Sequence, residues 1–198
     1  VQRVVRHDNG VELHTTGGAI WFDEVIFACH SDQALALIDS PSPAEREVLG
    51  AIRYQPNRAL LHTDSRLLPK ARQAWAAWNY ESTVNAQTEQ PTVCLHYLLN
   101  KLQPLPTQRP IVVSLNPLRE PAEHTVLREI SYAHPIFDQA AIDAQQRVPE
   151  LQGQRHSYFC GAWCGYGFHE DGLKSGYAAA QALLTTVDAQ PADRALAA

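Results

Sequence analysis

A stretch near the end of the chain, GAWCGYGFHEDGLKSG (161–176), gathers residue types that could hold a ligand. Gly165, Gly167 and Gly172 surround the run His-Glu-Asp at 169–171, directly before an Ala-rich helical pattern. Unpaired amides at a helix start carry partial positive charge and can meet the anionic or electron-rich edge of a ligand. Because glycine has no side chain, a ligand could approach this backbone closely.

The same residues also permit a plainer interpretation, a tight surface turn followed by ordinary helix packing. Gly172 and the alanines at 178–180 would then let the helix pack closely against a neighbour. Glu170 and Asp171 would complement the positive end of the helix. The residue types alone leave both interpretations open.

The elements before this corner begin with a predicted hairpin. Asn-Gly within residues 7–10 is a strong hairpin signal between strand-like residues 1–6 and 11–16. Gly-Gly then turns the chain into a third strand at 19–23. The continuous apolar run at 24–30 predicts a strand buried on both faces.

Helices are predicted from caps and apolar spacing. Ser42 before Pro43 marks the start of a helix over 40–52. Further on, the pattern predicts a helix at 135–148, a strand at 154–163 and a long helix at 171–187.

The middle of the chain carries five strand-like runs without a long helix between them, at residues 58–64, 74–82, 92–100, 109–117 and 124–133. Short connections between consecutive strands favour an antiparallel or mixed sheet. The predicted class is therefore α+β. Alternation would place Ala76, Trp78 and Tyr80 on one face, which could floor a substrate cavity or simply pack.

Composition narrows the classes of function. The chain has 198 residues and a formal net charge of −5, with no basic block, which argues against nucleic acid as the partner. No apolar run reaches the length of a membrane span, so no transmembrane segment is predicted. The four cysteines are scattered, as is typical of a reduced, cytoplasmic protein.

A resemblance adds to these observations. DEVIFACHSDQAL (23–35) and YFCGAWCGYGFHEDGLKSGYAAA (158–180) resemble the flavin-containing amine oxidase and phytoene desaturase superfamily. The chain is most similar to the bacterial predicted NAD/FAD-binding oxidoreductases that carry a GFHEDG signature. The resemblance implies FAD as cofactor and a final strand and helix that return to the FAD-binding domain. It also implies a mixed, largely antiparallel substrate-domain sheet with flanking helices.

Carried over residue by residue, the resemblance implies a set of cofactor-binding residues. The amides of Asp171, Gly172 and Leu173 would point at the flavin or its phosphate arm. The full set is Val4, Ala28, Trp163, Gly167, Phe168, His169, Glu170, Asp171, Gly172 and Leu173.

One motif of this superfamily is missing. A dinucleotide-binding unit needs G-x-G-x-x-G after its first strand, and the chain has only Gly165-Tyr166-Gly167. We therefore expect a carboxyl-terminal fragment that binds FAD poorly by itself and could form homo-oligomers through exposed surfaces. Residues 1–52 are predicted to belong to the FAD domain, 53–150 to a substrate domain, and 151–198 to the FAD domain again.

The predicted function is that of a parent FAD-dependent oxidoreductase. It would remove a hydride from a C–N or C–C bond of a small or lipid-like substrate, and the fragment alone would be inactive. No catalytic base is assigned. A non-catalytic α+β binding or scaffold module is the alternative. No metal is predicted, because Cys160 and Cys164 lack the usual C-x2-C spacing of a zinc site.

Overall fold

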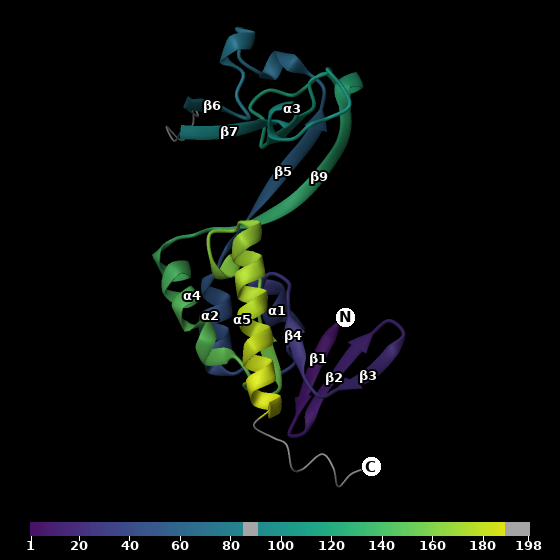
Figure 1. Cartoon of the computed structure of the whole chain (residues 1–198), viewed down its shortest axis with the longest axis vertical. Coiled ribbons are helices and arrows are strands. Elements are labelled where there is room, and N and C mark those ends of the chain that lie inside the picture. The colour runs from purple at the N-terminus through teal and green to yellow at the C-terminus, as the bar shows by residue number, and fades with distance from the viewer. Residues whose placement is uncertain (85–90, 189–198) are drawn as a thin grey trace. The chain divides into compact units, whose positions relative to one another are not determined.

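The computed structural model describes residues 1–84 and 91–188 and divides the chain into two compact units (Figure 1). Unit 1 consists of Val1–Tyr54 together with Pro135–Ala198, and unit 2 is the continuous segment Gln55–His134. The two ends of the chain therefore build one body. The predicted α+β class is confirmed, since both units combine helical turns or helices with sheets.

Unit 1 begins with a three-stranded antiparallel sheet formed by β1 (Arg3–His7), β2 (Gly10–Thr15) and β3 (Gly18–Phe22). His7 pairs with Gly10, so the predicted hairpin turn contains two loop residues. Gly10 has a φ of 154°, and a Cβ there would lie 2.6 Å from the carbonyl oxygen of Phe22. The turn therefore requires glycine at this position.

A second, parallel pair joins β4 (Val25–Phe27) to β10 (Ser157–Phe159). Both strands are shorter than the predicted runs. Ile26 in the middle of β4 is 40% exposed, so the prediction of a strand buried on both faces is wrong. No described residue covers the side chain of Ile26 fully.

Helices pack around this pair, at α1 (Ser31–Leu37), α2 (Pro43–Ala51), α4 (Gln139–Leu151) and α5 (His169–Asp188). The predicted cap of α2 is confirmed, because Ser42 Oγ accepts the amide of Glu45 and Glu45 Oε2 accepts the amide of Ser42. Asp138 caps α4 in the same manner by accepting the amide of Ala141 at 2.9 Å. Side-chain caps thus fix where both helices begin.

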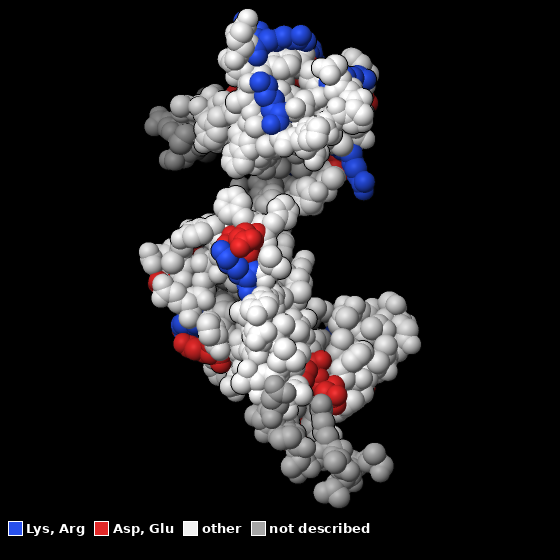
Figure 2. Space-filling model, viewed as in Figure 1, with Lys and Arg blue, Asp and Glu red and all other residues white. Residues whose placement is uncertain are grey.

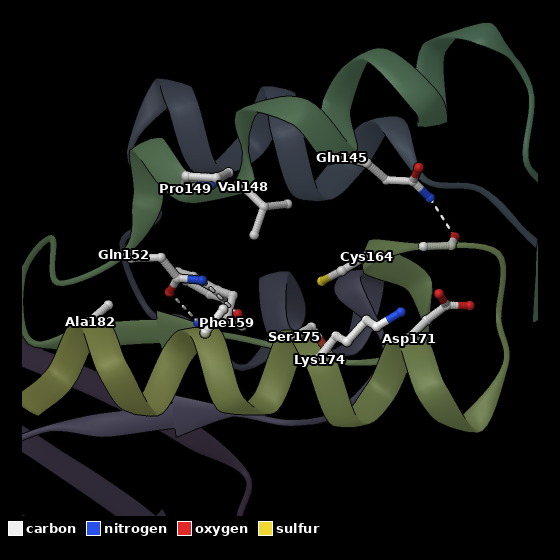
Figure 3. Close-up of a pocket in the computed structure, with 12 residues that line it drawn as sticks. Gln145, Val148, Pro149, Gln152, Phe159, Cys164, Asp171, Lys174, Ser175 and Ala182 are labelled. Atoms are coloured by element: carbon white, nitrogen blue, oxygen red, sulfur yellow. Dashed lines mark hydrogen bonds between the residues drawn. The ribbon is translucent and has the colours of Figure 1, made fainter.

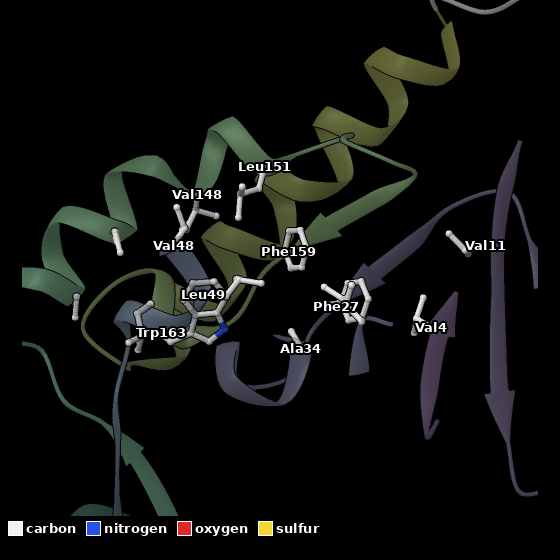
Figure 4. Packing of buried hydrophobic residues seen from close by; sticks show 14 residues of the cluster. Val4, Val11, Phe27, Ala34, Val48, Leu49, Val148, Leu151, Phe159 and Trp163 are labelled. Atoms are coloured by element: carbon white, nitrogen blue, oxygen red, sulfur yellow. The ribbon is translucent and has the colours of Figure 1, made fainter. Parts of the chain in front are cut away.

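The core of unit 1 is a continuous apolar cluster between the helices, the parallel pair and the first sheet (Figure 4). Phe27 and Phe159, on adjacent strands, stack with ring centroids 5.2 Å apart. The other fully buried members include Val4, Val11, Ala34, Val48, Leu49, Val148, Leu151 and Trp163. Since α4 contributes to this cluster, unit 2 ends at His134, whereas the sequence placed the boundary at residue 150.

One buried ion pair interrupts this apolar core. Arg6 of β1 donates from both terminal nitrogens to the carboxylate of Glu45 in α2, and its Nη2 also donates to the carbonyl of Ser40. Both side chains are almost fully buried. The pKa of Glu45 is lowered: burial opposes ionisation, but the bonds from Arg6 and the Ser42 amide outweigh it.

Unit 2 is built on a five-stranded sheet in the order β6-β7-β8-β5-β9. The strands are β5 (Tyr54–His62), β6 (Trp78–Val84), β7 (Pro91–Leu98), β8 (Val112–Leu115) and β9 (Val126–Pro135). The pairs β6–β7, β7–β8 and β5–β8 are antiparallel. All five predicted strand-like runs are therefore strands of one largely antiparallel sheet.

Short helical segments connect these strands, namely η1 (Ser65–Leu67), η2 (Arg72–Ala74), α3 (Leu99–Leu102) and η3 (Glu123–Thr125). Leu68, Leu98 and Val112 form a small buried cluster in this unit. Within residues 1–84 and 91–188, no helix combines the length and the apolar character that crossing a membrane requires.

Candidate functional site

The glycine corner, defined as residues 161–173, lies where the parallel strands β4 and β10 end. A short helix η4 (Ala162–Cys164) follows β10, and α5 begins at His169, two residues before the predicted start. The indole Nε1–H of Trp163 donates to the carbonyl of Cys29 at 3.0 Å and ties the corner to the end of β4. In open α/β sheets, ligands bind outside the carboxyl ends of such strands.

Asp171 organises the loop inside the corner. Its Oδ2 accepts the amides of Tyr166 and Phe168, each at 3.0 Å. A Cβ on Gly165 would lie 2.6 Å from the carboxyl carbon of Asp171, and Gly167 has a φ of 87°. The folding of the loop itself therefore accounts for these two glycines.

The structure corrects the predicted direction of the helix amides. Asp171 and Gly172 both donate to the carbonyl of Phe168, at 3.0 and 3.2 Å, because α5 begins earlier than expected. The amide of Leu173 lies one turn inside the helix, where an α-helix uses it internally. The amides of His169 and Glu170 have no hydrogen-bond partner among the described residues, so they are the donors at the helix mouth.

Contacts within the described residues do not explain why positions 172 and 176 of α5 are glycine. A Cβ on Gly172 would come no closer than 3.8 Å to the nearest atom, the amide nitrogen of Ala162, and one on Gly176 would meet nothing within 4 Å. Glycine inside a helix costs about 1 kcal/mol relative to alanine. The described part of the chain would therefore accept alanine at both positions.

The remaining residues that were predicted to bind the cofactor differ in their exposure. Gly167, Phe168, His169, Glu170 and Leu173 are exposed at the corner, and Ala28 is exposed at the end of β4. Trp163 and Val4, by contrast, are 3% and 1% exposed and belong to the apolar core. Val4 pairs with Leu13 of β2 and forms a bridge to Ile38, and its side chain is buried in the core of unit 1.

Three thiols lie around the corner and are all free. Burial raises the pKa of Cys29 and of Cys160. Burial and the nearby Cys160 raise the pKa of Cys164 to about 12, although bonds from Ser175 and Gly161 oppose the shift. The thiols are therefore protonated at neutral pH. Separately, the described residues contain no group of three or more His, Cys, Asp or Glu side chains that could hold a metal ion.

A cavity of about 470 Å³ adjoins the corner between α4 and α5 (Figure 3). Gln145 in its wall donates to the carbonyls of Trp163 and Gly165, and Gln152 bonds both the amide and the carbonyl of Phe159. The other polar wall residues are Asp171, Ser175 and Lys174, and Lys174 pairs with Glu170 at 3.4 Å. Val148, Phe159, Cys164, Ala178 and Ala182 supply apolar walls. Most of the cavity wall therefore suits an apolar group, and the ammonium of Lys174 is the cation among its lining residues. No motif in the sequence signalled Gln145 or Gln152.

A polar ladder, defined as Glu81, His96, Ser114 and His62, crosses four strands of unit 2. The Oγ of Ser114 lies 2.6 Å from His96 Nδ1 and 2.7 Å from His62 Nε2, and His96 Nε2 lies 3.2 Å from Glu81 Oε2. His62, His96 and Ser114 are 1% exposed or less. No local pattern in the sequence predicts this ladder, because its members are far apart along the chain.

The hydrogen bonds fix the position of each proton in the ladder. The amide of Asp64 donates to His62 Nδ1, so His62 carries its proton on Nε2 and donates to Ser114. Ser114 then donates to His96 Nδ1, and His96 donates from Nε2 to the carboxylate of Glu81. Burial, followed by the nearby His96, lowers the pKa of His62, although Asp64 opposes the shift. His62 is therefore neutral in the folded protein.

Arg119 completes the exposed end of the ladder. Its Nε donates to Glu81 Oε1 at 2.9 Å, and its Nη2 lies 3.3 Å from Glu81 Oε2. Bonding to Arg119, which outweighs partial burial, lowers the pKa of the Glu81 carboxyl. The ladder therefore ends in an ionised carboxylate that is already shared between a guanidinium and an imidazole.

Comparison with known proteins supports the fold alone. No protein family model matches the chain, and no curated protein matches it. Among solved structures, the chain is similar to a CLA-producing fatty acid isomerase from P. acnes, with a TM-score of 0.55, 15% identity and coverage of 92% of this chain and 46% of that one. It is likewise similar to cyclohexylamine oxidase from Brevibacterium oxydans IH-35A, with a TM-score of 0.53, 11% identity and coverage of 95% and 48%.

A redesigned putrescine oxidase is also similar, with a TM-score of 0.59, 12% identity and coverage of 93% of this chain and 48% of that one. The chain thus spans about half the length of the solved chains that it matches. Nearly all of this chain shares their fold, and about half of each of those chains has no counterpart here.

Proposed function

We propose that this chain is the carboxyl-terminal part of an FAD-dependent oxidoreductase. The complete enzyme would remove a hydride from a C–N or C–C bond of a small or lipid-like substrate. Solved structures that share the fold include two amine oxidases and a fatty acid isomerase, and one of them concerns redesign of cofactor binding in putrescine oxidase. These similar structures, together with the GFHEDG resemblance, support the reaction class.

The parallel pair β4–β10 is the observation that carries this proposal. Parallel strands occur almost only in larger sheets that are covered on both faces. Val25 and Phe27 direct their peptide groups at β10, so those of Ile26 point to the other edge, where no described strand pairs. The pair therefore lacks a neighbour on the β4 side, as expected if a dinucleotide-binding sheet continues there.

The exposed face of α5 supports the same conclusion. Leu173, Tyr177 and Leu184 are 68%, 67% and 52% exposed and follow one stripe of the helix at spacings of four and seven. Figure 2 shows this surface as white along most of α5, after a small group of charges at its start. Apolar stripes of this kind mark surfaces that other polypeptide covers.

Residues of the glycine corner, together with Gly176 one turn further along α5, would suit a flavin dinucleotide. Gly172 and Gly176 leave the helix surface without side chains, and the His169 and Glu170 amides offer two donors. These groups would hold the electron-rich edge of the isoalloxazine or the phosphate arm. When bound, the flavin would supply hydride acceptance, a chemistry that no protein side chain provides. The corner would orient it and shield one side from water.

Replacing Gly172 tests this proposal in a longer protein that contains this chain and the missing half of the fold. We expect the wild type to bind one FAD per chain. Gly172→Leu should weaken FAD binding about tenfold or more, since tenfold corresponds to only about 1.4 kcal/mol and the new side chain would occupy the cofactor's place. The visible absorption of bound flavin and a titration with FAD measure this effect.

Gly50→Leu is a matched control, because Gly50 is also a helical glycine whose Cβ would meet its nearest neighbour, Leu35 Cδ2, at 3.7 Å. Both variants remove a helical glycine, so neither should lose thermal stability through helix propensity. Equal flavin occupancy in both variants and the wild type would contradict the assignment of the corner.

A further inference from the structure

The loops of unit 2 form a second cavity, with a volume of about 440 Å³, which we call the loop cavity. Its walls come from Trp75 after η2, from the end of β7 with α3, and from the loop at 104–110 that leads to β8. Cavities of about 300–1,000 Å³ are the size in which proteins bind small molecules. The loop cavity is therefore large enough for a small ligand.

Asn100 fixes the shape of the loop cavity. Its Nδ2 donates to the carbonyls of Thr107 and Arg109, at 3.1 and 3.0 Å, and its Oδ1 accepts the amide of Ile111 at 2.8 Å. The side chain of Asn100 is thus used to hold the loop at 104–110 against α3. A site that is tied in this manner before a ligand arrives loses less conformational entropy on binding.

Apolar side chains supply much of the wall, namely Trp75, Leu98, Pro104, Leu105 and Pro110. Leu98 is 2% exposed and belongs to the small buried cluster of unit 2, against which Trp75 packs. The indole Nε1–H of Trp75 donates to the carbonyl of Pro69 at 2.8 Å, so its polar atom is already occupied. This part of the wall suits an apolar ring or a short hydrocarbon chain.

Two cations lie at the loop cavity without a carboxylate beside them. Lys101 lines the cavity, and the guanidinium carbon of Arg72 lies 5.2 Å from the ring centroid of Trp75, which lines it too. Within residues 1–84 and 91–188, neither cation forms a hydrogen bond or ion pair through its side chain, and the lining residues include no Asp or Glu. Other arginines of unit 2 do pair with carboxylates, namely Arg58, Arg66 and Arg119.

Stacking prepares Arg72 to bind an anion. A guanidinium that lies over an aromatic ring keeps the N–H donors in its own plane free for hydrogen bonds. Those donors match a carboxylate or phosphate with two parallel bonds, and the ammonium of Lys101 adds a second positive charge. A cationic ligand would meet like charges here, which excludes an amine as the preferred occupant.

We propose that the loop cavity binds a small amphipathic anion, a molecule with an apolar ring or short chain and one phosphate or carboxylate group. The anionic group would bind Arg72 and Lys101, and the apolar part would lie against Trp75 and Leu98. This inference goes beyond the proposed function, because all of these residues belong to unit 2 and binding requires no flavin. The concave wall favours a small molecule over a flat membrane surface.

Naphthyl phosphate and naphthoate are suitable probes, because each joins an apolar ring system to one anionic group. Isothermal titration calorimetry of the purified chain should show saturable binding of at least one probe at a single site. Inorganic phosphate lacks the ring and naphthol lacks the charge, so each should bind about tenfold more weakly or worse, equivalent to about 1.4 kcal/mol. The absence of saturable binding by both probes would overturn the proposal, as would equally tight binding of naphthol.

Charge variants test whether the two cations form the site. Arg72→Gln and Lys101→Gln should each weaken binding of the probe about tenfold, because each removes a charge-assisted hydrogen bond. Arg128→Gln is a matched control, since it removes the same charge from another exposed position of unit 2, on β9, and should leave binding unchanged. All three side chains are exposed, so the variants should fold. Equal losses in the three variants would contradict the proposal.

A further variant tests whether the probe lies inside the loop cavity. Leu105→Trp keeps both cations but fills the space beside them, and it should weaken binding of the probe about tenfold or more. Unchanged affinity would place the probe on the open surface and refute the site.

A membrane surface is the competing partner for these cations. Sedimentation with phosphatidylglycerol vesicles that Lys101→Gln abolishes, without saturable binding of either probe, would refute the small-molecule site in favour of a membrane. Loss of the proposed flavin site would not affect the result, because the titration is made with the chain in the absence of FAD.

Discussion

In unit 1 the buried centre consists of apolar side chains between helices and the parallel pair, whereas the buried face of the unit 2 sheet carries His62, His96 and Ser114. Apolar packing is non-directional and tolerates small shifts. A hydrogen-bonded ladder depends on distances, on directions and on which nitrogen carries a proton. The two units should therefore respond differently to the same kinds of change.

The largest effect on stability is expected at the buried Arg6–Glu45 pair, because it places two charges in the otherwise apolar core of unit 1. Arg6→Ala would leave the Glu45 carboxylate buried without a counter-charge and should lower the free energy of unfolding of unit 1 by about 3–5 kcal/mol. Segment-resolved hydrogen exchange in α2 and β1 measures this loss. Peptides of unit 2 should keep their protection.

Arg3→Ala removes an exposed ion pair with Asp39 from the same strand and is a control that should cost at most about 1 kcal/mol. Equal losses of stability in Arg6→Ala and Arg3→Ala would contradict the view that the buried pair contributes more than an exposed one.

A smaller effect is expected from the ladder in unit 2. Ser114→Ala would leave His62 without an acceptor and His96 without a donor, both in a buried place, and should destabilise unit 2 by about 1–3 kcal/mol. Ser82→Ala, at an exposed position of β6, should change stability by less than about 0.5 kcal/mol. Hydrogen exchange in β7 and β8 distinguishes the two, and an unchanged rate in Ser114→Ala would contradict the ladder's role.

The smallest effect concerns pH: the stability of the two units should change in opposite directions as the pH changes. The lowered pKa of His62 means that unit 2 binds fewer protons when folded, so its stability should fall as pH drops below the ordinary histidine value of about 6.5. In unit 1, burial lowers the pKa of His156, but bonds to the Asp8 carbonyl and the Glu24 carboxylate outweigh it and raise the pKa overall. The contribution of His156 is therefore complete below about 6.5 and is lost as pH rises through its raised value.

Exchange rates corrected for intrinsic pH dependence, measured in β10 and in β8, report on these two trends separately. His156→Gln should remove the loss of stability that unit 1 shows as the pH rises. His62→Gln should remove the loss of stability that unit 2 shows as the pH falls. Parallel trends in both units would show that other groups control their pH dependence.

Local patterns in the sequence predicted most of the fold. Asn9-Gly10 marked the first hairpin, Ser42 and Pro43 marked a helix start, and alternation along 74–82 placed Trp78 and Tyr80 on one face, as the register of β6 confirms. Each of these depends on neighbours within a few residues.

Features that depend on contacts between distant segments escaped prediction. Ser114 lies 18 residues from His96 and 52 from His62, so only the strand register brings them together. The resemblance alone implied a ligand contact for Val4, which stays a prediction, whereas the burial of its side chain in the core depends on distant segments. The amides of Asp171 and Gly172 were misassigned because the side chain of Asp171 starts the helix two residues early, an effect that helical periodicity does not reveal.

The side chain of Gln152 has a consequence for how this protein assembles. Its amide occupies the outer edge of β10 much as a single residue of a neighbouring strand would, so the sheet is sealed there. The turn at residues 153–154 closes the same border at Ser157, where Gly153 donates to the carbonyl of Ser157 and the amide of Ser157 donates to the carbonyl of Gln154. Among the described residues, no strand pairs at the opposite border, where the peptide groups of Ile26 point away from β10. A polypeptide that completes this sheet is therefore expected to attach beside β4.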